Sequence, residues 1–222
     1  MKTESQKKIE AIIFPATILA GLYALYYVFM VVPNEKIMGP VQRIFYFHVG
    51  AAMATYCSVG IIFISALLHF ATRNKTWDIL ATSAGEVALV FCSIVMATGM
   101  IWGHAAWNTW FRWEPRLVSF LILLLIILGL NLLRKFGDKE RVPNQAAAFA
   151  ILAAINVPLV IWSIDLLPQS AQLHPKVVQE QGLKDPTFVT GMFLGMSAMI
   201  MLQILMIWVR TKVEFGIRRK AS

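Results

Sequence analysis

Charged residues are scarce in this sequence of 222 residues. Only 14% are charged and 58% are hydrophobic, whereas soluble domains average roughly 25% charged and roughly 45–50% apolar residues. Cysteine is also rare, because Cys57 and Cys92 are the only two and form no CxxC pair. The sequence thus contains no redox motif or cysteine metal cluster. No repeat or domain boundary is visible, so we predict one integral membrane domain over residues 1–222.

The net charge of +8 does not predict a nucleic-acid partner. Lys and Arg occur in short clusters between apolar runs rather than in one basic patch. This arrangement is typical of the loops of a membrane protein. Membrane lipid, and not nucleic acid, is therefore the expected surrounding of this chain.

The apolar runs predict an all-α bundle of six transmembrane helices. A helix needs about 20 apolar residues to cross the hydrocarbon core. The first run follows a basic N-terminus but has no small-residue cleavage site, so we predict a retained first helix rather than a cleaved signal peptide. The six runs cover roughly 11–32, 44–70, 79–101, 116–134, 145–167 and 188–209.

The distribution of positive charge predicts the orientation of the bundle. With the N-terminus inside, 14 of the 20 Lys and Arg residues lie on the inner side. Cytoplasmic loops carry such an excess, so both termini are predicted to be cytoplasmic. The connections at 32–43, 102–115 and 168–187 then face outward.

The second outer connection belongs to a segment, residues 102–119, that is unusually rich in tryptophan. It holds Trp102, Trp107, Trp110 and Trp113, four of the seven tryptophans, among polar and charged residues. An interfacial aromatic belt is the alternative explanation, but four indoles this close together are denser than a belt requires. We predict an outer aromatic platform for a large flat ligand.

Three of the four histidines fall on the outer side of the predicted topology. His48 lies near the outer end of the second helix, His104 in the tryptophan-rich segment and His174 in the third outer connection. Two imidazoles that approach an aromatic surface from opposite sides would satisfy six-coordinate haem iron, and His48 and His174 suit this role. For His69 and His104 an ordinary interfacial side chain is the simpler interpretation.

Three arginines, Arg43, Arg112 and Arg116, lie at the same predicted level. They could make charge-assisted hydrogen bonds to haem propionates, although Arg43 and Arg116 also begin helices and could be interfacial anchors. Glu86, inside the third run, either bonds across the bundle or belongs to a polar path. Asp165 either orients a histidine or meets water. We expect no enzymatic activity.

The residues WGHAAWNTWFRWEPRLVS of segment 102–119 resemble the signature of the tryptophan-rich haem-handling membrane proteins of cytochrome c biogenesis. The ending and the short six-helix chain resemble the haem exporter protein C (CcmC) branch of that family. The stretch RIFYFHVGAA around His48 and the run from WSID to His174 are similar to its two histidine segments. Phe111 stands where the family usually has a second tryptophan, and Glu114 where it has Asp.

The resemblance implies a protein that holds haem b at the periplasmic face of the bacterial inner membrane. It implies His48 and His174 as axial ligands, the four tryptophans as the haem platform, and a retained carboxylate at Glu114. It also implies haem delivery to a membrane-anchored haem chaperone (CcmE), with a single-span partner (CcmD) and ABC-type transporter subunits (CcmAB).

Two other functions stay open from the sequence. A cytochrome-b-like electron carrier usually places histidine pairs deep between facing helices, and no histidine lies near a helix centre here. A small-molecule permease could use the tryptophans as an entry gate. Glu86 and the fifth helix, which Asn156 and Pro158 interrupt, favour the permease.

Overall fold

Six helices dominate the computed structural model, which describes residues 4–36, 38–138, 140–166, 168 and 185–221. All six are long and apolar enough to cross a membrane. Among the described residues, the β structure is limited to one isolated bridge between Glu35 and Gly39. The predicted all-α membrane protein with six spanning helices is confirmed. The helices are α1 (Glu4–Tyr26), α2 (Arg43–Thr72), α3 (Lys75–Trp107), α4 (Pro115–Phe136), α5 (Val142–Trp162) and α6 (Pro186–Ala221).

Local sequence signals fix where several helices begin. The Asn74 side chain accepts a hydrogen bond from the Thr76 amide at 2.9 Å and caps α3. Pro115 occupies the first turn of α4, where its missing N–H costs nothing. Asp185 accepts a hydrogen bond from the Thr187 amide at 2.7 Å before α6. This backbone hydrogen bond holds the pKa of Asp185 below its ordinary value.

The predicted outer loop at 102–115 is too long at its N-terminal end. Helix α3 continues to Trp107 and ends where Asn108 adopts a left-handed conformation with φ of 52°. The Asn108 amide donates to the His104 carbonyl, a common way to end a helix. The connection is therefore only residues 108–114, which we call the tryptophan loop. The polar residue His104 did not stop the helix, because a helix can continue beyond the hydrocarbon core.

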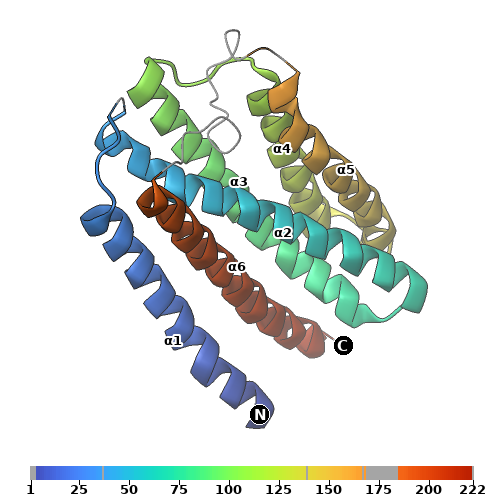
Figure 1. Ribbon diagram of the computed structural model, residues 1–222. Coiled ribbons are helices and arrows are strands. Elements are labelled where there is room, and N and C mark those ends of the chain that lie inside the picture. Colours follow the sequence, from blue (N-terminus) through green and yellow to red (C-terminus); the bar gives the residue numbers. More distant parts are fainter. Residues whose placement is uncertain (1–3, 37, 139, 167, 169–184, 222) are drawn as a thin grey trace.

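The helices form a bundle in which α2 and α3 are central (Figure 1). Helix α6 packs against both of them, α4 and α5 cover the opposite side, and α1 lies outermost against α6. Three short helices, η1 (Tyr27–Val31), η2 (Pro40–Gln42) and η3 (Ser163–Asp165), complete the helix ends.

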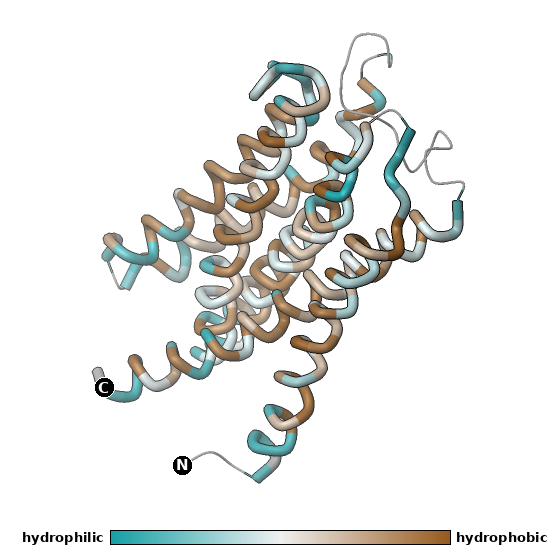
Figure 2. Tube along the Cα trace, turned by 90° about the vertical axis from the view of Figure 1, so that its left-hand side faces the viewer, coloured by the Kyte–Doolittle hydropathy of each residue, from teal (hydrophilic) through white to brown (hydrophobic). Residues whose placement is uncertain are grey.

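Apolar residues fill the middle of the helices and polar residues mark their ends, as Figure 2 shows. The two termini lie at one end of the bundle, and the tryptophan loop lies at the other (Figure 1). The helix directions therefore alternate as the charge-based topology requires. Which end faces the cytoplasm stays a prediction from the distribution of Lys and Arg.

Helices α2 and α6 cross closely near His48, and this crossing holds the N-terminal half of α2 against α6. A Cβ atom added to Gly195 of α6 would lie 2.6 Å from the carbonyl oxygen of Tyr46 in α2. A Cβ atom added to Gly50 of α2 would lie 2.8 Å from the carbonyl oxygen of Gly195. Glycine at both positions lets the two backbones meet, as in small-residue crossings of membrane helices.

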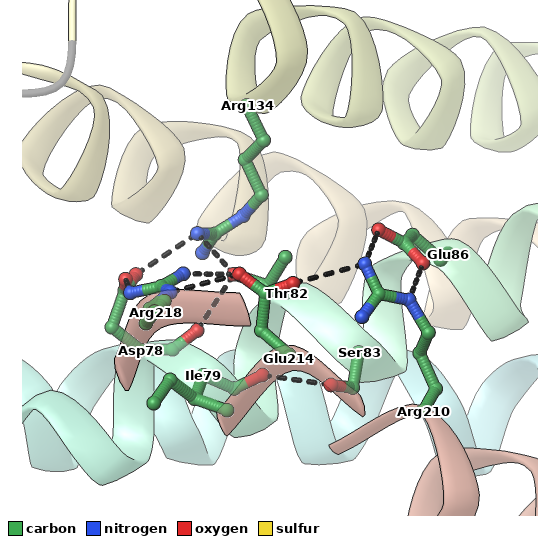
Figure 3. A network of polar contacts seen from close by, with 9 residues as sticks. All are labelled: Asp78, Ile79, Thr82, Ser83, Glu86, Arg134, Arg210, Glu214 and Arg218. Atoms are coloured by element: carbon green, nitrogen blue, oxygen red, sulfur yellow. Dashed lines mark hydrogen bonds and ion pairs between the residues drawn. The ribbon is translucent and has the colours of Figure 1, made fainter. Parts of the chain in front are cut away.

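A network of ion pairs joins α3, α4 and α6 near the end that holds the termini (Figure 3). Arg134 of α4 and Arg218 of α6 both donate to Asp78 of α3, at 2.9 Å and 2.7 Å. Arg210 of α6 donates to Glu86 of α3. Glu86 thus bonds across the bundle, one of its two predicted roles. The α3–α4–α6 network consists of Asp78, Glu86, Arg134, Arg210, Glu214 and Arg218.

Candidate functional site

A cavity of about 500 Å³ lies between α2, α3, α4 and the end of α5, bounded by the tryptophan loop. This volume is within the range of roughly 300–1,000 Å³ that is typical of small-molecule sites. Most of the lining is apolar or aromatic and includes Phe45, Val49, Met96, Leu117 and Val160. Such a cavity suits a largely apolar ligand that a few polar groups orient.

The last two turns of α3 supply an aromatic wall of this cavity. Trp102 is only 4% exposed, and its ring centroid lies 5.5 Å from that of Trp107. Both indoles line the cavity. The Nε1 atom of Trp102 is buried and has no hydrogen-bond partner among the described residues.

The tryptophan loop adds a second aromatic wall, but not all of its rings face the cavity. Trp110 and Phe111 line the cavity, and Trp110 also stacks on His104 with ring centroids 4.1 Å apart. Trp113 is 82% exposed and packs edge-on against Phe111 outside the lining. Of the four tryptophans predicted as a platform, the structure thus brings Trp102, Trp107 and Trp110 together.

His48 lines the same cavity from α2. Its Nδ1 atom lies 2.9 Å from Oγ1 of Thr98 in α3. Gly99 lets the ring approach, because a Cβ atom at that position would lie 3.2 Å from Cε1 of His48. The His48 ring also packs against Trp102, with centroids 6.2 Å apart. His48, the first predicted ligand, therefore lines the same cavity as the aromatic wall and packs against it.

Two of the three predicted arginines, Arg112 and Arg116, line the cavity. Arg112 pairs with Glu114, whose side chain is almost fully buried, at 3.5 Å between Nε and Oε1. The third, Arg43, is absent from the lining and places its guanidinium over the ring of Phe29.

Arg116 begins α4 and lies within electrostatic range of Tyr56 in α2 and Asp165 in η3. Asp165 therefore neighbours a cation of the cavity.

His174, the second predicted ligand, lies outside the described residues. The connection that contains it follows η3, and Ile164 of η3 lines the cavity. Within the described ranges no group of three or more His, Cys, Asp or Glu side chains could hold a metal ion. The pairing of His48 with His174 stays a prediction.

Tyr56 and Thr98 belong to the site but were not predicted from the sequence. The spacing of His48, Ala52 and Tyr56, at i, i+4 and i+8, places them on one face of α2. This spacing was a usable signal for Tyr56. No comparable signal marks Thr98, because its contact with His48 depends on how α2 and α3 pack.

Comparison with known proteins supports one family. The profile described as "Heme exporter protein C" (CcmC) matches residues 2–222. The protein named Heme exporter protein C of Bradyrhizobium diazoefficiens is 32% identical over 134 residues, which are 60% of this chain and 51% of the relative. The one of Paracoccus denitrificans is 24% identical over 192 residues, 86% of this chain and 80% of the relative.

The protein of the same name from Escherichia coli K12 is 30% identical over 137 residues, 60% of this chain and 55% of the relative. The matches thus span about half of the Bradyrhizobium and Escherichia relatives and four fifths of the Paracoccus one. The family profile, by contrast, covers nearly the whole sequence. This chain belongs to the Heme exporter protein C family.

Proposed function

We propose that this protein binds haem in the cavity beside the tryptophan loop and passes it on during cytochrome c maturation. The observation that supports this most is that one apolar cavity holds an imidazole, an aromatic wall and two guanidinium groups. The name of these relatives, Heme exporter protein C, supports the same ligand.

The residues of the cavity fit haem b in size and chemistry. The indoles of Trp102, Trp107 and Trp110 offer apolar faces to a porphyrin. His48 offers a neutral nitrogen as an axial ligand. Arg112 and Arg116 can donate charge-assisted hydrogen bonds to propionates. Haem is here the cargo, and we assign the chain no enzymatic step.

We propose His174 as the second axial ligand. Its connection starts beside Ile164 in the cavity wall. A ligand on a connection rather than on a helix would allow haem to be released without moving a transmembrane helix.

We further propose that the cavity faces the periplasm of a bacterial inner membrane. We also propose that a haem chaperone (CcmE) receives the haem and that the chain assembles with a single-span partner (CcmD) and an ABC-type transporter (CcmAB), as the family resemblance implies. The excess of Lys and Arg at the opposite end supports the orientation.

The absorption spectrum of the protein purified from cells tests this function. We expect a low-spin haem spectrum, because two imidazoles give iron a strong ligand field. His48→Ala and His174→Ala should each lower the haem content or change the spectrum. His69→Ala is the matched control, since His69 lies at the far end of α2 against the Asn74 carbonyl. Unchanged haem content and spectrum in both ligand variants would rule out the ligand assignment.

The structure weakens the main observation in favour of a permease. Glu86 pairs with Arg210 in the α3–α4–α6 network rather than standing alone in a polar path. A haem-free purified protein that transports a solute into vesicles would still favour a permease.

A further inference from the structure

We infer that Thr98 is a positioning residue that holds His48 in the tautomer with the proton on Nδ1 and so keeps Nε2 free to bind iron. The tautomer follows from hydrogen bonds of the protein itself. Only the consequence of this tautomer, that Nε2 of His48 binds iron, rests on the proposed function.

We assign the proton of the Thr98 hydroxyl to the bond within α3, because that contact of Oγ1 is the shortest. Oγ1 of Thr98 donates to the Ile94 carbonyl at 2.7 Å, and the Val95 carbonyl lies further away at 3.3 Å. A hydroxyl group has one proton to donate and two lone pairs to accept with. Toward His48, at 2.9 Å, Thr98 can therefore only accept. With this assignment Nδ1 of His48 carries the hydrogen atom.

A neutral imidazole has a single N–H, so a proton on Nδ1 leaves a lone pair on Nε2. Among the described residues, the one hydrogen bond of His48 is the bond to Thr98. Nε2 is therefore not engaged by any of them, and the ring lines the cavity. Histidines that bind metals commonly donate their other N–H to a nearby oxygen, which fixes both tautomer and ring orientation.

Other residues of α3 restrict the ring as well. Gly99 leaves room for the His48 ring, because a Cβ atom added at that position would lie 3.2 Å from Cε1 of His48. The ring of Trp102 packs beside the His48 ring, with centroids 6.2 Å apart. Thr98, Gly99 and Trp102 are spaced at i, i+1 and i+4, on neighbouring positions of one helix face. Thr98 sets the protonation of the ring, and its two neighbours set its position.

Side-chain chemistry separates the hydrogen bond from the packing. Valine has nearly the shape of threonine but cannot accept a hydrogen bond, whereas serine keeps the hydroxyl and loses only a methyl group. Thr98→Val should therefore remove the preference of His48 for the tautomer with the proton on Nδ1, and Thr98→Ser should keep that preference. Thr17→Val is the matched control, because Thr17 on α1 makes the same bond to its own helix, to Ile13, without contacting a histidine.

Nitrogen chemical shifts of isotope-labelled histidine in the haem-free protein measure the tautomer directly. We expect His48, assigned by its loss in His48→Ala, to carry the proton on Nδ1 in the wild type, Thr98→Ser and Thr17→Val. Thr98→Val should shift His48 toward a mixture of tautomers. A proton on Nε2 in the wild type, or an unchanged tautomer in Thr98→Val, would overturn the inference and leave the proposed function standing.

Haem affinity measured by transfer to a haem-scavenging globin links the tautomer to binding. Loss of a hydrogen bond behind a metal ligand typically lowers affinity about 10- to 100-fold, and we expect this for Thr98→Val. The same change in a His48→Ala background should have no further effect, because Thr98 acts through His48. If Thr98→Val lowers the haem affinity as much in the His48→Ala background as in the wild type, Thr98 has only a structural role. Wild-type affinity in His48→Ala would instead refute the proposed role of His48 as an axial ligand and would leave the assignment of the tautomer unaffected.

Discussion

The guanidinium of Arg116 reaches the cavity, whereas that of Arg43 lies over Phe29 outside it. Both arginines begin helices and look equivalent along the sequence. A cation in an apolar cavity interacts strongly with a carboxylate, since water screens the pair less there than at a surface. Arg116 should therefore contribute to ligand binding and Arg43 should not.

Replacement of Arg116 by Gln should lower haem affinity by about 10- to 100-fold, the equivalent of one charged hydrogen bond of roughly 1.5–3 kcal/mol. Arg43→Gln should leave the affinity within about twofold, as expected for a side chain outside the site. Haem titration of both variants by absorption spectroscopy measures this difference. Equal losses in the two variants would contradict the placement of the propionates.

The residues of the candidate site could be predicted from the sequence where residue type and membrane topology were enough to place them. The distribution of Lys and Arg and the density of tryptophan predict from the sequence alone that His48, Trp102, Trp107 and Trp110 lie at one end of the bundle. Neither signal states how a helix is rotated about its axis. For this reason position at a helix start alone did not separate Arg116 from Arg43, although the motif favoured Arg116, and the sequence did not reveal the contact between Thr98 and His48.

At the scale of the elements, the crossing of α2 and α6 determines where His48 lies. Gly195 meets the Tyr46 carbonyl, and a backbone atom cannot rotate away as a side chain can. Gly60, on the same helix as His48, has nothing within 4 Å of an added Cβ. The two glycines are thus a matched pair for testing the crossing.

We expect Gly195→Ala to lower the free energy of unfolding by about 1–3 kcal/mol, the usual cost of overpacking. Gly60→Ala should be neutral or slightly stabilising, because Ala favours a helix by roughly 1 kcal/mol over Gly. Unfolding in denaturing detergent, followed by circular dichroism, reports both values. A Gly195→Ala protein as stable as the wild type would show that the crossing is looser than described.

The α3–α4–α6 network should be the most sensitive polar contact of the fold. Asp78 and Arg134 have side chains that are each only 9% exposed. Asp78→Ala would leave Arg134 and Arg218 without this carboxylate, and breaking a buried pair from one side costs about 3–5 kcal/mol.

Glu4→Ala is the control for this prediction, because its pair with Lys7 spans 3.9 Å and is largely exposed. Exposed pairs contribute roughly 0–1 kcal/mol. The same unfolding measurement applies to both variants. If both changes cost the same, the network contributes no more than a surface ion pair.

The number of helices was predictable from apolar runs, but their ends were not. A hydropathy window detects the part of a helix that lies in hydrocarbon, whereas hydrogen bonding decides where the helix ends. Helix α3 continues to the left-handed Asn108, and α6 continues to Ala221, well past the predicted end at 209. The shortened tryptophan loop holds Trp110 against the cavity and leaves Trp113 exposed.

In the whole molecule, the tryptophan loop and the two termini lie at opposite ends of the bundle (Figure 1). The loop lines the cavity, so the cavity belongs to the end away from the termini. The function requires the cavity end to face outward. Native Cys92 is buried and Cys57 lies on α2 within its membrane span, so a water-soluble thiol reagent should leave the wild type unlabelled.

A membrane-impermeant maleimide should label Trp113→Cys in intact cells, because position 113 is highly exposed on the tryptophan loop. Arg141→Cys, between α4 and α5, is the matched site at the other end and should react only after lysis. The opposite pattern would reverse the predicted orientation of both termini.

The position of iron in a structure of the haem-loaded protein decides whether His48 and the aromatic wall hold the haem. We predict iron within coordination distance of Nε2 of His48, with the porphyrin beside Trp102, Trp107 and Trp110 and a propionate at Arg116. Iron bound elsewhere, or bound to Nδ1 of His48, would contradict this account.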